Sequence, residues 1–292
     1  MAGIFGFFNF EKEGPGIDKN APKKKAFIVF FETFFRNFWK FITINLVYTL
    51  ISLPILTNGL SAVGITHVTR NTARDKHSFG LSDFFETIKK NWKQALPAGI
   101  LNAIIYICLI FAAYFYFSSE GIMSTIGLGI TLSALLIFTM MNMYIWTLMI
   151  TFKFSFKQIY KNSYKFAFIS LFKNFLCLLC LGLVYVINIL ILILAFNISI
   201  NAFVLVSTVL AMLYILTYPS FKFLLIQYFT FSTIKKYIID PYYLEHPDED
   251  IDKRRDLGIE IESEDDNDDD NDDDNDDGND DGGEDDQLIF NY

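Results

Sequence analysis

The sequence predicts an all-α protein, a polytopic transmembrane bundle of about six membrane-embedded helices whose first two form a short hairpin. The chain is unusually apolar for a soluble protein, since hydrophobic residues make up 52% and aromatic residues 17% of its 292 residues. Four of its apolar runs are long enough to cross a hydrocarbon core of about 30 Å as helices. Basic residues are confined to some of the connectors, which is typical of a membrane protein with a fixed orientation.

The four long runs lie at residues 95–117, 122–152, 174–196 and 202–225, and their one charged residue is Lys222. The connector within each pair of runs is short and nearly uncharged, whereas the segments before, between and after the pairs are rich in lysine and arginine. The positive-inside rule therefore places the basic segments and the C-terminus in the cytoplasm and the two short connectors outside.

The N-terminal segment is also basic, yet the apolar residues 41–66 separate it from the basic segment 67–94. Two crossings would place both basic segments in the cytoplasm, and a single crossing would place the N-terminus outside. The motif FFETFFRNFWK at residues 30–40 recurs as FFETIKKNWKQ at residues 84–94, and each copy leads into an apolar run. This pattern is typical of an interfacial helix that feeds a membrane helix. We therefore expect two crossings, with both termini cytoplasmic.

The expected hairpin has its tip at Asn58 and Gly59, about 27 Å along a helix from Lys40 and so close to the outer boundary. Pro54 lacks an amide donor and loosens the last turn of the first helix. Small residues after the tip allow a close approach between helices on the return. The candidate residues of the hairpin are Pro54, Asn58, Gly59, Gly64, Arg70, Asn71 and Arg74.

The chain divides into a cytoplasmic N-terminus with an interfacial helix at 1–40, a transmembrane helical domain at 41–240 and a disordered acidic cytoplasmic tail at 241–292. The tail holds 17 of the 33 acidic residues between Glu262 and Asp286. Residues 1–261 therefore carry a net charge of 24 − 16 = +8, although the whole chain carries −9. A tract of like charges with few apolar residues cannot bury enough surface to fold.

The tail also matches the spacing of an EF-hand calcium loop, at Asp273, Asn275, Asp277, Gly278 and Glu284. Such a match arises easily in a tract composed of Asp and Asn. Weak binding of divalent cations by a disordered polyanion is favoured over a formed site.

Ionisable groups are scarce in the apolar runs. No carboxylate lies between Glu120 and Asp240, so the usual proton and sodium relays of secondary transporters have no visible ionisable groups there. The polar residues of the runs are mainly Asn and Tyr, which favour hydrogen bonding between helices over the alternative of a lining for a neutral, hydroxyl-rich ligand. They include Asn102, Asn142, Tyr144, Tyr185 and Asn188.

Two arrangements could suggest metal or redox chemistry. His67 and His77 flank two arginines, but ten residues of separation without a fixed scaffold is a weak metal signal. Cys177 and Cys180 have the spacing of a redox motif, but they lie in an apolar run, where thiols behave as small hydrophobes. We predict no catalytic residue, no bound metal and no cofactor.

Three stretches within residues 3–95 form a distinctive pattern: GIFGFFNFEKEGPGIDKNAPKKKAF, FFRNFWKFITINLVYTLISLPILTNGLSAVGITHVTRNTARDKHSF and SDFFETIKKNWKQ. They resemble the YesL-like family of bacterial integral membrane proteins, a domain-of-unknown-function family. That family tends to have Gly-Pro-Ala after the Leu-Pro segment of the hairpin, where this chain has Gly59-Leu60-Ser61. The resemblance implies a bacterial plasma-membrane protein, often encoded beside carbohydrate uptake systems, with no established reaction and no catalytic residues.

We therefore expect an integral plasma-membrane protein that is a non-enzymatic accessory or regulatory partner of carbohydrate uptake. The alternative is a small permease or channel for a neutral solute. A membrane enzyme acting on lipid has the least support, because no nucleophile, base and carboxylate converge at one depth. The expected partners are the lipid bilayer and a carbohydrate transport system, not nucleic acid, and the oligomeric state is left open.

Overall fold

The structure is a computed structural model that describes residues 26–76 and 78–245, and no strand occurs within them. Short connectors link its helices in chain order: α1 (Ala26–Arg36), α2 (Phe38–Ser52), the 3₁₀ turn η2 (Ile55–Thr57), α3 (Asn58–Ala73), α4 (Leu81–Ser118), α5 (Ile122–Thr151), α6 (Phe156–Ile169), α7 (Leu171–Ile198), α8 (Ile200–Ile234), the π-helical turn η3 (Lys235–Ile239) and α9 (Asp240–Glu245). The all-α prediction is confirmed.

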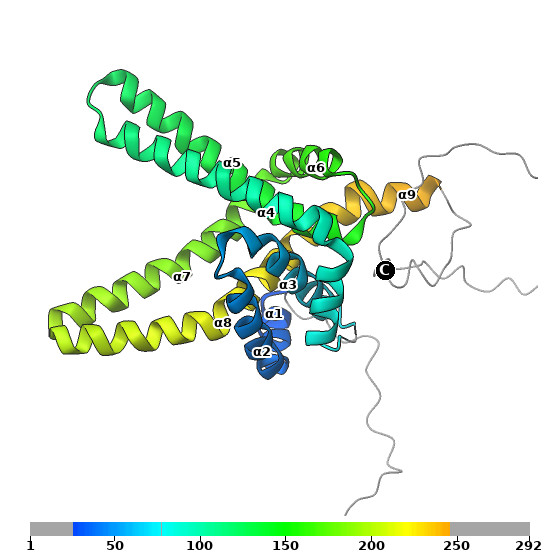
Figure 1. Cartoon of the computed structure of the whole chain (residues 1–292), viewed down its shortest axis with the longest axis horizontal. Helices are drawn as coiled ribbons and strands as arrows, with labels where there is room; N and C mark the ends of the chain where they lie inside the picture. Colours follow the sequence, from blue (N-terminus) through cyan, green and yellow to red (C-terminus); the bar gives the residue numbers. More distant parts are fainter. Residues whose placement is uncertain (1–25, 77, 246–292) are drawn as a thin grey trace, which may run out of the picture.

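Two long helical hairpins, α4–α5 and α7–α8, extend from a common end of the molecule and diverge from each other (Figure 1). We call these hairpins the arms, and the end at which α1, α3, α6 and α9 lie the base. All four helices of the arms are long and apolar enough to cross a membrane. The four long runs read from the sequence are therefore confirmed as helices of a multi-pass membrane protein.

Each arm turns tightly at its tip. The α4–α5 connector contains Gly121 at a φ of 106°, a left-handed conformation that glycine adopts without a steric penalty. In the α7–α8 connector, the Ser199 hydroxyl accepts a hydrogen bond of 3.1 Å from the backbone amide of Ala202 and caps α8. These caps let the arms reverse direction without long polar loops.

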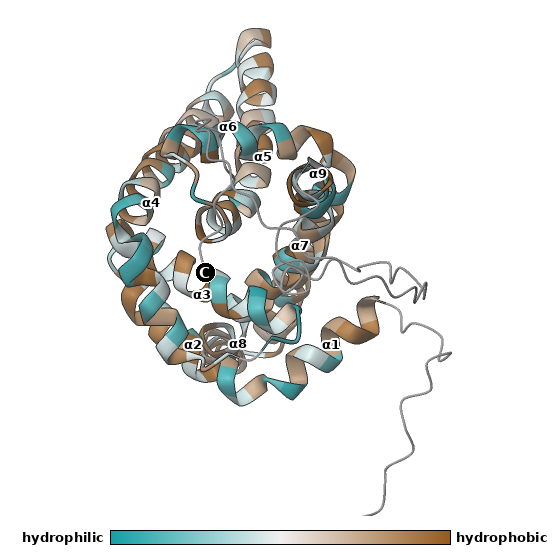
Figure 2. Ribbon diagram, turned by 90° about the vertical axis from the view of Figure 1, so that its right-hand side faces the viewer, coloured by the Kyte–Doolittle hydropathy of each residue, from teal (hydrophilic) through white to brown (hydrophobic). Residues whose placement is uncertain are grey.

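Helix α3 forms the centre of the base. Seen along the arms from the base, it lies inside a ring of the other helices (Figure 2), and ten of its sixteen residues are buried. Its buried threonines remain hydrogen-bonded inside the helix: Thr66, Thr69 and Thr72 donate to the carbonyl oxygens one turn earlier at 2.6 to 2.8 Å. Small side chains and satisfied hydroxyls allow this helix to be packed on every side.

The first copy of the repeated motif covers the end of α1 and the first turn of α2. In α1, Phe30 and Phe34 pack on Phe221 of α8 with ring centroids 5.3 and 5.7 Å apart, while Phe27 and Phe35 remain exposed. The second copy does not form a separate helix, because it is continuous with the α4 span through Pro97. Its turns nevertheless run along the base before α4 enters the arm (Figure 1).

The two basic segments on either side of the first hairpin lie at the same end of the molecule. Arg36, at the end of α1, forms an ion pair with Asp75 in the α3–α4 connector. Lys40 Nζ donates to the Ser78 carbonyl oxygen at 3.4 Å. A single crossing between these segments would place them at opposite ends, whereas the structure places both at one end.

The predicted position of the hairpin tip is wrong. The turn is formed by Pro54 and η2, so Asn58 and Gly59 begin α3. Gly59 lies against Ala95 and Gly99 of α4, and Gly99 is about 28 Å along that helix from the arm tip at Ser118. The hairpin thus enters the bundle and returns without reaching the level of the arm tips.

The polar groups of this turn are satisfied locally, as a turn at membrane depth requires. The Thr57 hydroxyl donates to the carbonyl oxygens of Ile51 and, at 2.9 Å, of Pro54. The backbone amide of Thr57 also donates to Pro54 at 2.9 Å. Pro54 itself has no amide hydrogen that would need a partner.

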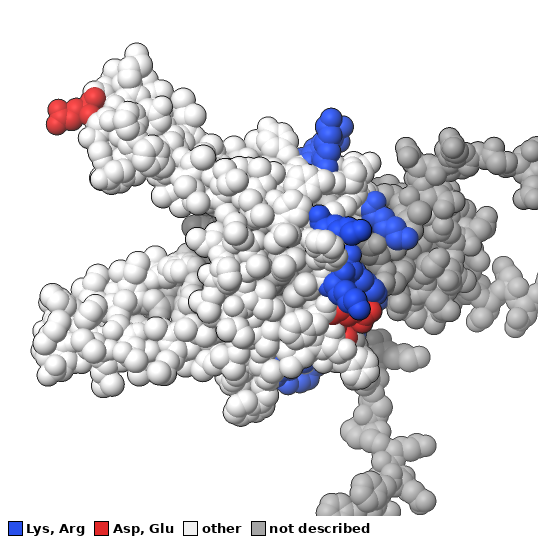
Figure 3. All heavy atoms as spheres, viewed as in Figure 1, with Lys and Arg blue, Asp and Glu red and all other residues white. Residues whose placement is uncertain are grey.

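Charge is distributed along the long axis as the sequence suggests. Lysine and arginine gather at the base, and an acidic residue marks the far end of the α4–α5 arm (Figure 3), whose connector contains Glu120. The predictions for residues 1–25, for His77 and for the acidic tail from residue 246 lie outside the described residues.

Candidate functional site

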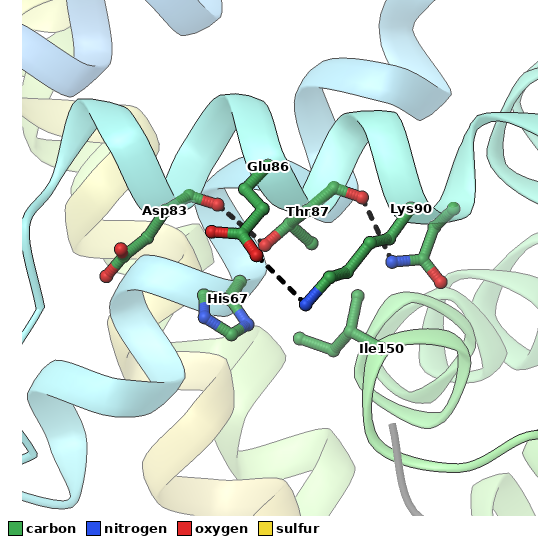
Figure 4. Close-up of a pocket in the computed structure, with 7 residues that line it drawn as sticks. His67, Asp83, Glu86, Thr87, Lys90 and Ile150 are labelled. Carbon is green, nitrogen blue, oxygen red and sulfur yellow. Dashed lines mark hydrogen bonds and ion pairs between the residues drawn. The ribbon is translucent and has the colours of Figure 1, made fainter. Parts of the chain in front are cut away.

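A polar pocket of about 420 Å³ opens at the base between α3, α4 and α5. Helix α3 contributes His67, the end of α5 contributes Ile150, and the first turns of α4 contribute most of the charge. The side chains of His67, Glu86 and Lys90 converge, with Asp83 at the edge (Figure 4). The lining residues are His67, Asp83, Glu86, Thr87, Lys90, Asn91 and Ile150.

His67 is neutral at physiological pH. Burial, and next the positive charge of Arg70, lower the pKa of its imidazole from 6.5 to about 4. Its Nε2 lies 3.0 Å from the side-chain nitrogen of Asn71. Because that amide nitrogen is a donor, Nε2 accepts the hydrogen bond and Nδ1 carries the proton of the neutral ring. The pocket therefore contains an uncharged imidazole between two helices.

The first turns of α4 hold the charged groups in a fixed pattern. Glu86 and Lys90 form an ion pair of 3.0 Å one turn apart. The Thr87 hydroxyl donates to the Asp83 carbonyl oxygen at 2.7 Å, and the Asn91 amide donates to the Thr87 carbonyl oxygen at 3.0 Å. Donors and acceptors of both charges thus line one small volume. Such a surface suits a polar solute or a polar segment of a partner protein.

Arg70 of α3 contacts Thr151, which follows the pocket residue Ile150. One of its terminal nitrogens donates to the Thr151 hydroxyl at 2.8 Å, and that hydroxyl donates to the Thr147 carbonyl oxygen at 2.6 Å. These bonds tie α3 to the last turn of α5. A charged side chain packed among helices requires such partners.

The remaining hairpin candidates serve packing. A Cβ atom on Gly64 would lie 2.8 Å from the Phe84 ring, so glycine allows that ring to be fully buried. The Arg74 guanidinium lies 4.4 Å from the centroid of the Phe231 ring, a cation–π contact that attaches α3 to α8. Asn58 accepts a hydrogen bond of 3.4 Å from the Tyr48 hydroxyl. The structure brings Arg70 and Asn71 to the pocket, but Pro54, Asn58 and Gly59 to the opposite end of α3.

Sequence reasoning missed the contribution of α4 to this site. Asp83, Glu86 and Lys90 lie in or beside the repeated motif, which was interpreted as a lipid-facing interfacial helix. The acidic residues Asp83 and Glu86 could have indicated this role, because the charged residues of an interfacial helix are mainly basic.

A second cavity, of about 270 Å³, lies where the two arms meet. Its polar lining residues are Tyr106, Thr139, Asn142, Tyr185, Tyr218 and Lys222. The Asn142 side chain accepts a 2.8 Å hydrogen bond from Asn102 of α4, and Asn102 accepts one of 2.8 Å from Tyr160 of α6. Hydrogen bonding between helices, predicted for these residues, is confirmed here.

Two further polar residues behave differently. Tyr144 donates to Asn174 at 2.6 Å and so joins the two arms near the base. Asn188, by contrast, donates to the Val184 carbonyl oxygen of its own helix at 2.7 Å. The hydrogen bond of Asn188 therefore lies within its own helix.

Within residues 26–76 and 78–245, no group of three or more His, Cys, Asp or Glu side chains is arranged to hold a metal ion. His77, the second histidine of the proposed pair, is outside those residues. Cys177 and Cys180 carry free thiols, the first buried and the second exposed.

The fold and its polar groups define an all-α, multi-pass membrane protein with a short helical hairpin packed into one end of its long helices. Residues 41–114 match the model of a family described as a protein of unknown function, DUF624. No curated protein and no solved structure matches the chain. The family match covers most of α2, all of α3 and nearly all of α4, and so includes the hairpin and two walls of the pocket at the base.

Proposed function

We propose that this chain is an integral plasma-membrane protein that acts as a non-enzymatic accessory or regulatory partner of a carbohydrate uptake system. In this proposal the basic base faces the cytoplasm, as the positive-inside rule favours. In this proposal the chain is YesL-like, and the resemblance of residues 3–95 to the YesL-like family supports both the membrane and the kind of partner.

One observation supports a partner role above the others: the arms contact each other near the base and diverge beyond it. Hydrogen bonds between the arms involve Tyr144, as above, and Thr147, whose hydroxyl accepts from Gln227 at 3.0 Å. Beyond this level the space-filling view shows the molecule hollowed between the arms (Figure 3). Ile130 of α5 and Leu194 of α7 are 66% and 65% exposed. Helices that diverge in this way leave apolar faces for lipid or for the helices of another protein.

The pocket at the base supports the regulatory part of the proposal. It gathers an imidazole, two carboxylates and an amine at the face where a transport system would expose its cytoplasmic domains. A partner loop or a polar solute that fills this pocket would contact α3, α4 and α5 together. Its binding would therefore be transmitted to both the α2–α3 hairpin and one arm.

The experiment is extraction in a mild detergent from the native host, with an affinity tag on the chain, followed by reconstitution into liposomes. We expect a carbohydrate transporter to be retained at a fixed stoichiometry and the isolated chain to carry no solute flux. A chain that is purified without a partner and transports sugar by itself would overturn the proposal.

The second candidate function, a permease or channel for a neutral solute, is favoured by the cavity between the arms. Phenol, hydroxyl and amide groups line its polar side, and such groups recognise hydroxyl-rich solutes. The liposome measurement tests it with labelled monosaccharides. Under this alternative, flux occurs with the chain alone and falls on the substitution Asn142→Leu, whereas Asn188→Leu leaves it unchanged.

A further inference from the structure

Lys222 occupies an unusual place for a cation. It lies on α8, about 33 Å along the helix from the arm tip at Ile200 and about 18 Å from the end of the helix at Ile234. Its side chain lines the cavity between the arms and is partly buried. Its ammonium group lies 5.4 Å from the centroid of the Phe223 ring. An ionisable side chain at such a depth is costly, and it is normally retained for a partner or a pathway.

Helix α8 itself contains no acidic residue. Glu120 lies in the connector at the tip of an arm, and the next acidic residue is Asp240, after α8 has ended. Among the described residues no carboxylate pairs with Lys222, and its polar neighbours in the cavity are uncharged phenols, hydroxyls and amides. The four long apolar runs of a second copy contain no carboxylate either.

The surroundings of Lys222 are shaped to receive a helix. The cavity lies at the closed end of the space between the diverging arms. Gly182 of α7 lines it, and no atom lies within 4 Å of the position that a Cβ atom would occupy there. A lining glycine that faces open space permits the close backbone approach that associates helices in lipid. Tyr185 and Tyr214, further along the arm, are hydrogen-bonded to each other at 2.9 Å and leave their rings partly exposed.

We infer that the cavity between the arms is the docking site for a transmembrane helix of a different protein, and that a carboxylate side chain of that helix pairs with Lys222. The inference rests on the proposed function and names the partner's chemistry: an apolar helix with one Asp or Glu toward its cytoplasmic end, level with Lys222. Pairing removes the cost of leaving either charge alone in lipid. Specificity follows, because a helix without the carboxylate leaves the lysine unpaired.

The test uses two synthetic transmembrane helices of leucine and alanine that differ only in one Glu or Gln, placed at the depth of Lys222. The full chain, with its cysteines replaced and a donor dye on Ser199→Cys at an arm tip, is reconstituted in phosphatidylcholine vesicles. Energy transfer to an acceptor dye on each peptide measures association. We expect the Glu peptide to associate about tenfold more tightly than the Gln peptide. Lys222→Arg should keep this preference and Lys222→Met should abolish it.

Matched controls separate docking from a loss of fold. Lys173→Met also removes one lysine, but at the base, and should leave the preference intact. Gly182→Leu should reduce association of both peptides, whereas Gly129→Leu, at another position with open space around its Cβ, should not. Each variant is used only after its thermal unfolding matches that of the parent. Because a desolvated charge is removed, we expect Lys222→Met to be at least as stable.

Equal association of the two peptides with the parent chain would overturn the inference, and so would a preference that survives Lys222→Met. The chain can also be tested for retention of oleate, a lipid with a carboxylate. If the two peptides associate equally and Lys222→Met abolishes oleate retention, the cavity is a site for a lipid carboxylate and not for a helix. Flux through the chain alone would overturn the proposed function and leave the peptide preference untouched. Loss of the preference without any flux would overturn only the docking inference.

Discussion

Replacing Gly59 by alanine should push the α2–α3 hairpin away from α4. The added Cβ atom would lie 2.1 Å from the Ala95 carbonyl oxygen and 2.8 Å from the Gly99 Cα atom. Carbon atoms pack at about 3.5–4.0 Å, so a shift on the order of 1 Å is needed. Both contacts are backbone atoms, which a rotamer change cannot move. The shift must therefore come from the two helices themselves.

The size of the effect follows from two opposing contributions. Overpacking a close-packed interior costs about 1–3 kcal/mol, and a clash with main chain belongs at the upper end of that range. Alanine offsets about 1 kcal/mol of this cost through its higher helix propensity. The net loss of about 2 kcal/mol corresponds to a fall in melting temperature of roughly 4–8 °C for a chain of this size.

The assay is thermal unfolding of the purified chain in detergent, followed by circular dichroism. Gly129→Ala is the matched control, because Gly129 also lies inside a helix but has no atom within 4 Å of the position that a Cβ atom would occupy. The control should gain stability from helix propensity alone. A Gly59→Ala variant as stable as Gly129→Ala would refute the close contact between α3 and α4.

Three more outcomes are expected. The pKa of His67 is lowered from 6.5 to about 4, so the unfolded chain binds a proton that the folded chain excludes, and stability falls as the pH drops from 6.5 to 4; thermal unfolding of His67→Gln across this window should show a shallower fall. Asn45→Leu should cost about 1–3 kcal/mol, because Asn45 donates to the Leu216 carbonyl oxygen at 2.7 Å and accepts from the Ser220 amide at 2.9 Å; an unfolding midpoint unchanged from that of Asn188→Leu would contradict this. In a cysteine-free background, Asn58→Cys should resist a membrane-impermeant thiol reagent added on the arm-tip side, where Glu120→Cys reacts; labelling at Asn58 would restore the outer tip that the sequence predicts.

The spans and the overall charge distribution could be read from the sequence because they are local properties. Composition and run length alone identify a membrane helix, since its length must match a bilayer. The presence of the first hairpin also followed from local signals, with Pro54 and small residues after an apolar run. The location of both basic segments at one end was predicted because two membrane crossings between them return the chain to the same side.

The depth of the hairpin could not be read from the sequence, because it depends on contacts across most of the chain. The estimate that placed Asn58 near the outer boundary multiplies the rise per residue by the number of residues. It assumes that the helix runs straight toward the opposite surface. Helix α2 instead packs on α8, where the Asn45 side chain bridges the backbone at Leu216 and Ser220, next to Pro219. No pattern in either segment alone indicates that pairing.

The pocket at the base shows the same limit. Glu86 and Lys90 were visible as part of a repeat, and His67 as an isolated histidine. What makes them a site is the packing of α3 along the first turns of α4, which depends on Gly64 leaving room for Phe84. Residue types can be listed from a sequence, but their convergence is a property of packing.

The hairpin contacts both arms and links the two cavities. Helix α3 packs against α4 and α5 of one arm and α8 of the other. On the arm-tip side of η2 the hairpin ends, and the space between the arms begins. Tyr48 of α2 packs on the Phe223 ring at 5.8 Å, and Phe223 is the ring beneath the Lys222 ammonium group. Displacing the hairpin should therefore disturb the cavity: we expect Gly59→Ala to weaken the preference for the Glu peptide and Gly129→Ala to preserve it. A Gly59→Ala variant that loses stability but keeps the full preference would show that the arms hold the cavity open without the hairpin.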